Sequence, residues 1–119
     1  MFKDVLSHVV SNTDGGIAAL IMGYDGIPLE QFNQEGRELD LEQVGMEYSV
    51  ILKNIRNAAE LLETGAAEEV AIKAERMTTV IRFLNDEYFL ALALQPDGNI
   101  GKGRFLLRTR AADILKAIE

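Results

Sequence analysis

The fold is decided by residues 40–65, DLEQVGMEYSVILKNIRNAAELLETG. Asp40 can cap the first turn of a helix, and Gln43 stands three residues later, where a capping box places its reciprocal partner. Apolar residues then recur at alternating steps of three and four, which is typical of one face of an α-helix. These residues are Leu41, Val44, Tyr48, Ile51, Ile55, Ala58 and Leu62. With Gly65 as the terminating residue, the pattern predicts a helix over 41–64 that is about 36 Å long.

The same helix carries a second apolar stripe on its far side. At about 100° per residue, the first stripe centres on Tyr48 and is expected to cover the sheet. The second stripe lies about 140–180° away and comprises Met46, Val50, Asn57 and Leu61. Single exposed apolar residues are common on protein surfaces, but a patch without a partner in its own domain usually marks an interface. We therefore expect this stripe to contact a partner protein or a second subunit.

Shorter elements flank the long helix on both sides. Helical spacing of apolar residues, consecutive apolar runs and the turn at Asp25-Gly26 define them. The expected elements are a helix over 2–10, strands over 17–22 and 27–32, a polar loop over 33–38, strands over 68–75, 77–84 and 88–94, and a helix from about residue 102. This order predicts one α+β domain over 1–119, with a five-stranded, mainly antiparallel sheet and helices on both faces.

Hairpin connections determine which strands lie at the edges of this sheet. If the two most apolar strands, 17–22 and 88–94, pair in the centre, the edges are 27–32 and 68–75. Pro28 has no N–H to donate and protects the first edge. The second edge lacks such a block, and an unblocked edge can pair with an identical strand across a two-fold axis.

This second edge therefore predicts a homodimer. The residues that would seal the joined sheet are Glu69, Val70, Ala71, Ile72 and Lys73. In an antiparallel self-pairing centred on Ala71, Glu69 of one copy would face Lys73 of the other, which places opposite charges directly across the junction.

Charge and composition exclude several classes of protein. The 119 residues carry a net charge of −7, and the ten acids and three bases of residues 30–69 account for all of it. A polyanion such as nucleic acid is not expected to bind such a chain. The absence of cysteine fits a reducing compartment, and no apolar run approaches the ~18 residues of a membrane span. A soluble, cytoplasmic protein is expected.

Residues with catalytic or ligand-binding chemistry are scarce. His8 is the single histidine and has no cysteine near it, so a surface histidine is favoured over a metal ligand. Gly98, Gly101 and Gly103 lie between a strand and a helix, as phosphate-binding loops do. Their spacing departs from the Walker pattern, so close packing of the backbone is favoured over nucleotide binding. We expect no enzymatic activity, no metal and no cofactor.

The last helix is basic. It carries Arg104, Arg108, Arg110 and Lys116 against Asp113 and Glu119. A solvated face is the simplest interpretation, and a patch that meets an acidic partner or the acidic middle of a second copy is the alternative.

Taken together, these features resemble the roadblock family, also called the dynein light chain roadblock type, which includes the MglB-like bacterial regulators. The resemblance covers about Phe2 to Ile118. It rests on the order of elements, the Asp25-Gly26 turn after an apolar strand and the long middle helix. A further feature is the tail Gly98-Asn99-Ile100-Gly101, followed by Arg104, Leu107, Ala111-Ala112 and Leu115.

The resemblance implies a homodimer with a continuous sheet and two long helices side by side. It also implies that these helices form a platform for a Ras-like small GTPase, whose hydrolysis the bacterial members stimulate or modulate without contributing an arginine finger. The expected function is therefore a non-enzymatic regulator or scaffold of such a GTPase. Two alternatives stay open: an adaptor subunit of a motility or signalling assembly, and a small-ligand sensor domain.

Overall fold

The helices and strands follow one another in the predicted order, α-β-β-α-β-β-β-α, in a computed structural model that describes residues 1–36 and 39–119. Their bounds are α1 Phe2–Ser11, β1 Gly16–Gly23, β2 Pro28–Asn33, α2 Leu41–Leu61, β3 Glu69–Lys73, β4 Thr78–Phe83, β5 Tyr88–Leu94 and α3 Ile100–Ile118. The loop expected over 33–38 begins with the last residue of β2, and its final two residues lie outside the described part of the chain.

The strands form one sheet in the order β2-β1-β5-β4-β3, and each neighbouring pair is antiparallel. This arrangement confirms that the two apolar strands pair in the centre and that β2 and β3 are the edges. Pro28 begins the edge strand β2, as its missing N–H requires.

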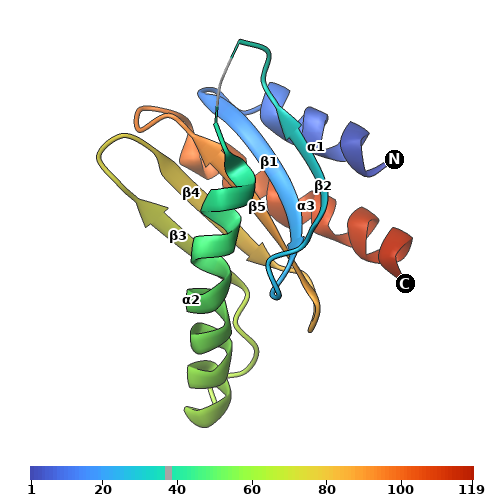
Figure 1. The fold of residues 1–119 in the computed structure, drawn as a ribbon, viewed down its shortest axis with the longest axis vertical. Helices are drawn as coiled ribbons and strands as arrows, with labels where there is room; N and C mark the ends of the chain where they lie inside the picture. The colour runs from blue at the N-terminus through green and yellow to red at the C-terminus, as the bar shows by residue number, and fades with distance from the viewer. Residues whose placement is uncertain (37–38) are drawn as a thin grey trace.

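Helices cover both faces of the sheet (Figure 1). The helices α1 and α3 lie behind it in this view and α2 lies in front, with its C-terminal turns projecting beyond the strands. Two hydrophobic clusters fill the space between the layers. Alternate residues of β1 separate them, with Ala19 and Ile21 in the cluster under α1 and α3, and Leu20 and Met22 in the cluster under α2.

The helix α2 begins as the sequence predicts and then faces the sheet with smaller residues than expected. An Asp40 side-chain oxygen accepts a hydrogen bond from the Gln43 N–H at 3.1 Å. The buried residues of the helix are Leu41, Gly45, Ser49 and Leu52. A Cβ on Gly45 would lie 2.7 Å from Leu20 Cδ2 and 2.8 Å from Met22 Sδ, so glycine allows the helix to approach β1 closely.

This close approach overturns part of the predicted sheet-facing stripe. Ile51 is 50% exposed and Leu62 is 72% exposed, whereas both were expected to pack on the sheet. The helix is rotated so that Gly45 and Ser49 face the strands, which turns Ile51 toward solvent. Leu62 is exposed for another reason, because it follows the last residue of α2 at the end that projects beyond the strands (Figure 1). Val44, Tyr48 and Ile55 do pack on the cluster beneath α2, as expected.

The C-terminal end of α2 also differs from the prediction. The helix spans 21 residues and ends at Leu61. The Glu63 N–H bonds the Glu60 carbonyl and the Thr64 N–H bonds the Ala59 carbonyl, both at 3.2 Å, which is the pattern of a Schellman motif. Glu63 has φ +56°, so a glutamate occupies the left-handed position that Gly65 was expected to provide.

The bounds of β3 and the first residue of α3 also differ from the prediction. The strand β3 covers only Glu69–Lys73 of the expected 68–75, because its pairing with β4 ends at the Lys73–Thr78 pair. The helix α3 begins at Ile100 rather than near Lys102, because an Asn99 side-chain oxygen accepts the Lys102 N–H at 3.0 Å and acts as the N-cap.

The positive φ of Glu63 predicts that glycine at this position stabilises the protein. Replacing Glu63 with glycine should raise the free energy of unfolding by about 1 kcal/mol, because glycine adopts a positive φ without the clash of a Cβ. The control is Glu60→Gly, the same change at an exposed position inside the helix, which should lower stability by about 1 kcal/mol. Urea unfolding followed by circular dichroism measures both values, and a loss of stability in both variants would contradict the assignment of Glu63.

Candidate functional site

The outward face of α2 presents a band of apolar side chains to solvent. Met46 is 54% exposed, Val50 is 59% exposed and Leu61 is 84% exposed, and Asn57 is exposed beside them. All of the residues predicted for the second stripe therefore lie on the surface. Ile51 and Leu62, which the sequence assigned to the sheet-facing side, join this surface, which makes it wider than expected. We call these six residues the α2 face.

The strand β3 forms an open edge of the sheet. Its only strand partner among the described residues is β4. Val70 and Ile72 point toward α2 and pack on the cluster beneath it, while Ala71 and Lys73 are exposed. The backbone groups on the outer side of this strand are therefore free to pair with another strand.

The α2 face and the β3 edge belong to neighbouring elements. Leu52 and Ile55 of α2 share one hydrophobic cluster with Val70 and Ile72 of β3. This shared packing holds the helix and the edge strand on the same side of the domain. The structure therefore brings together the two sets of residues that the sequence singled out separately.

An ion pair connects β3 to the other face of the sheet. Arg104 of α3 donates to the Glu69 carboxylate through Nε at 2.7 Å, and its Nη2 lies 2.6 Å from the same oxygen. This hydrogen bond raises the pKa of Arg104 above its ordinary value. The sequence did not reveal this contact, because the partners are separated by 35 positions and lie in different elements.

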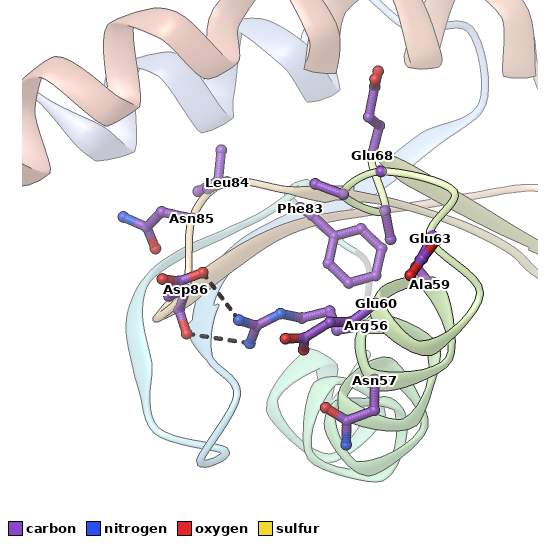
Figure 2. A pocket seen from close by; sticks show the side chains of 13 residues that line it. Arg56, Asn57, Ala59, Glu60, Glu63, Glu68, Phe83, Leu84, Asn85 and Asp86 are labelled. Atoms are coloured by element: carbon purple, nitrogen blue, oxygen red, sulfur yellow. Dashed lines mark hydrogen bonds and ion pairs between the residues drawn. The ribbon is translucent and has the colours of Figure 1, made fainter.

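A cleft of about 640 Å³ lies beside the projecting end of α2. Figure 2 shows Arg56 extending from the helix to Asp86 in the turn between β4 and β5. Arg56 Nη1 donates to the Asp86 carbonyl at 3.2 Å and Nη2 to its carboxylate at 3.1 Å. Glu60, Glu63 and Glu68 also line the cleft, so its lining is acidic.

Tyr24 is buried and packs between aromatic and cationic groups that include Arg56. Its ring centroid lies 6.2 Å from that of Phe83 and 5.5 Å from that of Phe89. The Arg56 guanidinium lies 4.4 Å from the ring centroid. The Tyr24 hydroxyl has no hydrogen-bond partner in the described part of the chain. Burial raises its pKa to about 12, although the Arg56 charge acts in the opposite direction.

The histidine and the glycines that the sequence raised as possible ligand-binding residues make contacts within the fold. His8 Nε2 lies 3.1 Å from Arg110 Nη2, which links α1 to α3. A Cβ on Gly98 would lie 2.7 Å from the Asp14 carbonyl oxygen, and one on Gly103 would lie 2.8 Å from Leu92 Cδ2, so close packing explains both glycines. Within residues 1–36 and 39–119, no three His, Asp or Glu side chains are grouped to hold a metal ion.

Comparisons with known proteins identify the architecture. The crystal structure of MglC from Myxococcus xanthus is 42% identical, with a TM-score of 0.72 and 98% of each chain covered. This chain belongs to the roadblock/LC7 family. The roadblock/LC7 domain from Streptomyces avermitilis has a TM-score of 0.85 at 10% identity, covering 98% of this chain and 96% of its own.

A third similar structure is the gliding protein MglB from Thermus thermophilus, with a TM-score of 0.81 at 20% identity, covering 97% of this chain and 85% of its own. Scans of protein-family models and of curated proteins find no match. Membership of the roadblock/LC7 family fits a regulator or an adaptor. No described helix is long and apolar enough to cross a bilayer.

The surroundings of Tyr24 predict a loss of stability at alkaline pH. The pKa of this tyrosine is about 12 in the folded protein and about 10 in an unfolded chain. The folded state therefore favours the neutral phenol, and this contribution is complete below pH ~10 and declines by roughly 2–3 kcal/mol as the pH rises toward 12. Urea unfolding at pH 8 and at pH 11.5 should show a smaller alkaline loss for Tyr24→Phe than for the parent chain.

At pH 8 the Tyr24→Phe variant should be as stable as the parent or slightly more stable, because the lost hydroxyl has no protein partner in the described part of the chain. The parent chain measured at the same two pH values is the control for all other titrating groups. Equal alkaline losses in both proteins would contradict this account.

Proposed function

We propose that this roadblock protein is a homodimer in which the β3 edges of two copies pair and the two α2 helices lie side by side. The open edge and the adjacent α2 face support this arrangement, because each leaves groups without partners on the same side of the domain. Pairing would join two five-stranded sheets into one and would cover the remaining edge that has no proline.

The charges at the proposed junction are compatible with antiparallel pairing about Ala71. Glu69 of one copy would then stand opposite Lys73 of the second copy. Lys73 forms no ion pair within 4.0 Å in the described residues, whereas Glu69 already binds Arg104. The proposed contact would therefore extend an existing pair into an Arg104–Glu69–Lys73 chain of alternating charges.

We further propose that the paired α2 helices bind a Ras-like small GTPase, and that the protein acts as its regulator or scaffold without catalytic groups of its own. The observation that carries this proposal is the α2 face, where five apolar side chains are at least half exposed on one helix. Exposed acids near this face, including Glu47 and Glu60, favour a partner with basic contact residues and salt-sensitive association.

An adaptor role in a motility assembly is the second candidate. It is favoured by the likeness to a protein described as the gliding protein MglB. In this case the α2 face would bind another component of the assembly, and no nucleotide hydrolysis would change.

The proposed dimer predicts a strong effect of charge at one position of β3. Ala71→Lys should weaken dimerisation at least about tenfold, because the two new ammonium groups would stand directly opposite each other across the two-fold axis. The control is Ala74→Lys, which adds the same charge at an exposed position just after β3. Sedimentation equilibrium at micromolar concentration measures both, and a monomeric parent chain would overturn the dimer.

The proposed partner predicts that the α2 face is needed for complex formation. Val50→Asp should weaken binding of a Ras-like GTPase from the same genome at least about tenfold, because it places a charge in the apolar contact. The matched control is Thr109→Asp, an exposed position on α3. Calorimetry with the GTPase in its GTP-analogue and GDP forms measures binding, and single-turnover GTP hydrolysis measures regulation.

The outcomes of this experiment separate the candidates. A complex with changed hydrolysis supports a regulator, and a complex with unchanged hydrolysis supports a scaffold. No complex from an intact dimer would overturn GTPase binding and would favour the adaptor.

A further inference from the structure

A second surface lies on the opposite side of the domain from the α2 face. Phe105 of α3 is 48% exposed, although it belongs to neither the dimer edge nor the α2 face. Lys102 Nζ lies 5.9 Å and Arg108 Cζ lies 5.7 Å from the centre of its ring. The aromatic ring is thus exposed between two cations, one helical turn before it and one after it.

The same ring forms one wall of a shallow hollow of about 360 Å³ between α3 and the β3–β4 edge. The hollow is lined by Glu68, Glu69, Arg82, Gly101, Arg104, Phe105 and Arg108. Its volume is at the lower end of the range of ligand pockets, about 300–1,000 Å³. A hollow of this size can accept one or two side chains of a bound segment.

The charges around the hollow are only partly compensated. Arg82 pairs with Glu68 at 3.6 Å and Arg104 pairs with Glu69 at 2.6 Å. Neither Lys102 nor Arg108 has an acidic partner within 4.0 Å in the described residues. The surface around Phe105 is therefore positive on a chain whose net charge is −7.

We propose that this hollow, which we call the Phe105 hollow, docks an acidic segment of a partner protein. An apolar side chain of the segment would enter the hollow against the Phe105 ring, and flanking carboxylates would pair with Lys102 and Arg108. The exposed ring provides apolar contact area, and the two cations provide the charge that selects an acidic sequence. All of the residues that line the hollow belong to one chain, and Glu69 among them also stands at the proposed dimer junction. Docking at the hollow does not require the GTPase proposed above.

Other anionic occupants fit the surface less well. A nucleic acid strand would continue past the hollow onto a chain with net charge −7, and Glu68 and Glu69 would lie against its phosphates. The acidic residues 30–69 of a second copy are complementary in charge. However, such a head-to-tail contact would assemble the chain into rings or open filaments rather than into the two-fold dimer proposed above.

Selection from a random-peptide phage library on the immobilised full chain tests the proposal. The enriched peptides should contain Asp or Glu on both sides of an aromatic residue or leucine. Binding of a synthetic enriched peptide, measured by fluorescence anisotropy, should weaken about fivefold or more for Phe105→Ala and for the double variant Lys102→Gln, Arg108→Gln. It should also weaken as NaCl is raised.

The matched control is Lys116→Gln, which removes the same charge from an exposed position of α3 that does not line the hollow. This variant should bind the peptide as the parent does. Circular dichroism melts of all variants should agree, since each altered side chain is exposed. This agreement ensures that lost binding reports on the surface rather than on folding.

Several results would overturn the proposal. These are no enriched peptide, enrichment of basic or uncharged peptides, and binding that Phe105→Ala leaves unchanged. Variant-sensitive binding of a single-stranded DNA oligonucleotide or of vesicles containing phosphatidylserine, without binding of the peptide, would assign the surface to those ligands instead. Salt-sensitive filaments that Phe105→Ala abolishes would assign it to a second copy of the chain.

Discussion

The pairing of β1 with β5 is the contact on which the rest of the structure depends. Residues 18–22 and 89–94 of these strands are at most 2% exposed, so both faces of the central sheet lie out of contact with water. A strand pair that is apolar on both sides needs a covering layer on each face. The helices α1 and α3 provide one layer and α2 provides the other (Figure 1).

The two outer strands of the sheet are less buried than the central pair and differ from each other. The strands β2 and β3 lie farthest from the central pair and are only partly buried. Pro28 protects β2, while β3 keeps an open edge beside a helix with exposed apolar residues. The open β3 edge and the exposed apolar residues of α2 are thus two features that the packing of the centre leaves uncovered. Exposed apolar patches of this kind usually mark interaction sites.

Charge also differs between the side of the domain around α2 and β3 and the outer surface of α3. The acidic residues lie in the middle of the sequence, around α2 and β3, whereas the outer surface of α3 is basic around Phe105. The Arg104–Glu69 ion pair stands where these regions meet and connects the edge strand to α3. The two faces therefore differ in both charge and apolar content, so each is suited to a chemically different partner.

The sequence by itself determined the order of elements, the edge strands, the Asp40 cap and the exposure of Met46, Val50 and Leu61. These features depend on periodicity, turn residues and capping, which act over a few neighbouring residues. The rotation of α2 about its axis, by contrast, depends on how the helix packs on the sheet. Gly45 fits against Leu20 and Met22, and this packing turns Ile51 toward solvent.

The contacts that define the cleft and the Phe105 hollow also required the tertiary structure. Arg56 and Asp86 are 30 positions apart, and Arg104 and Glu69 are 35 positions apart. Side chains this distant in the sequence meet only when helices pack on a finished sheet, so no local pattern records their contact. The sequence alone thus determined which charged and apolar residues the chain carries, and the packing of helices on the sheet decided which of them lie together on the surface.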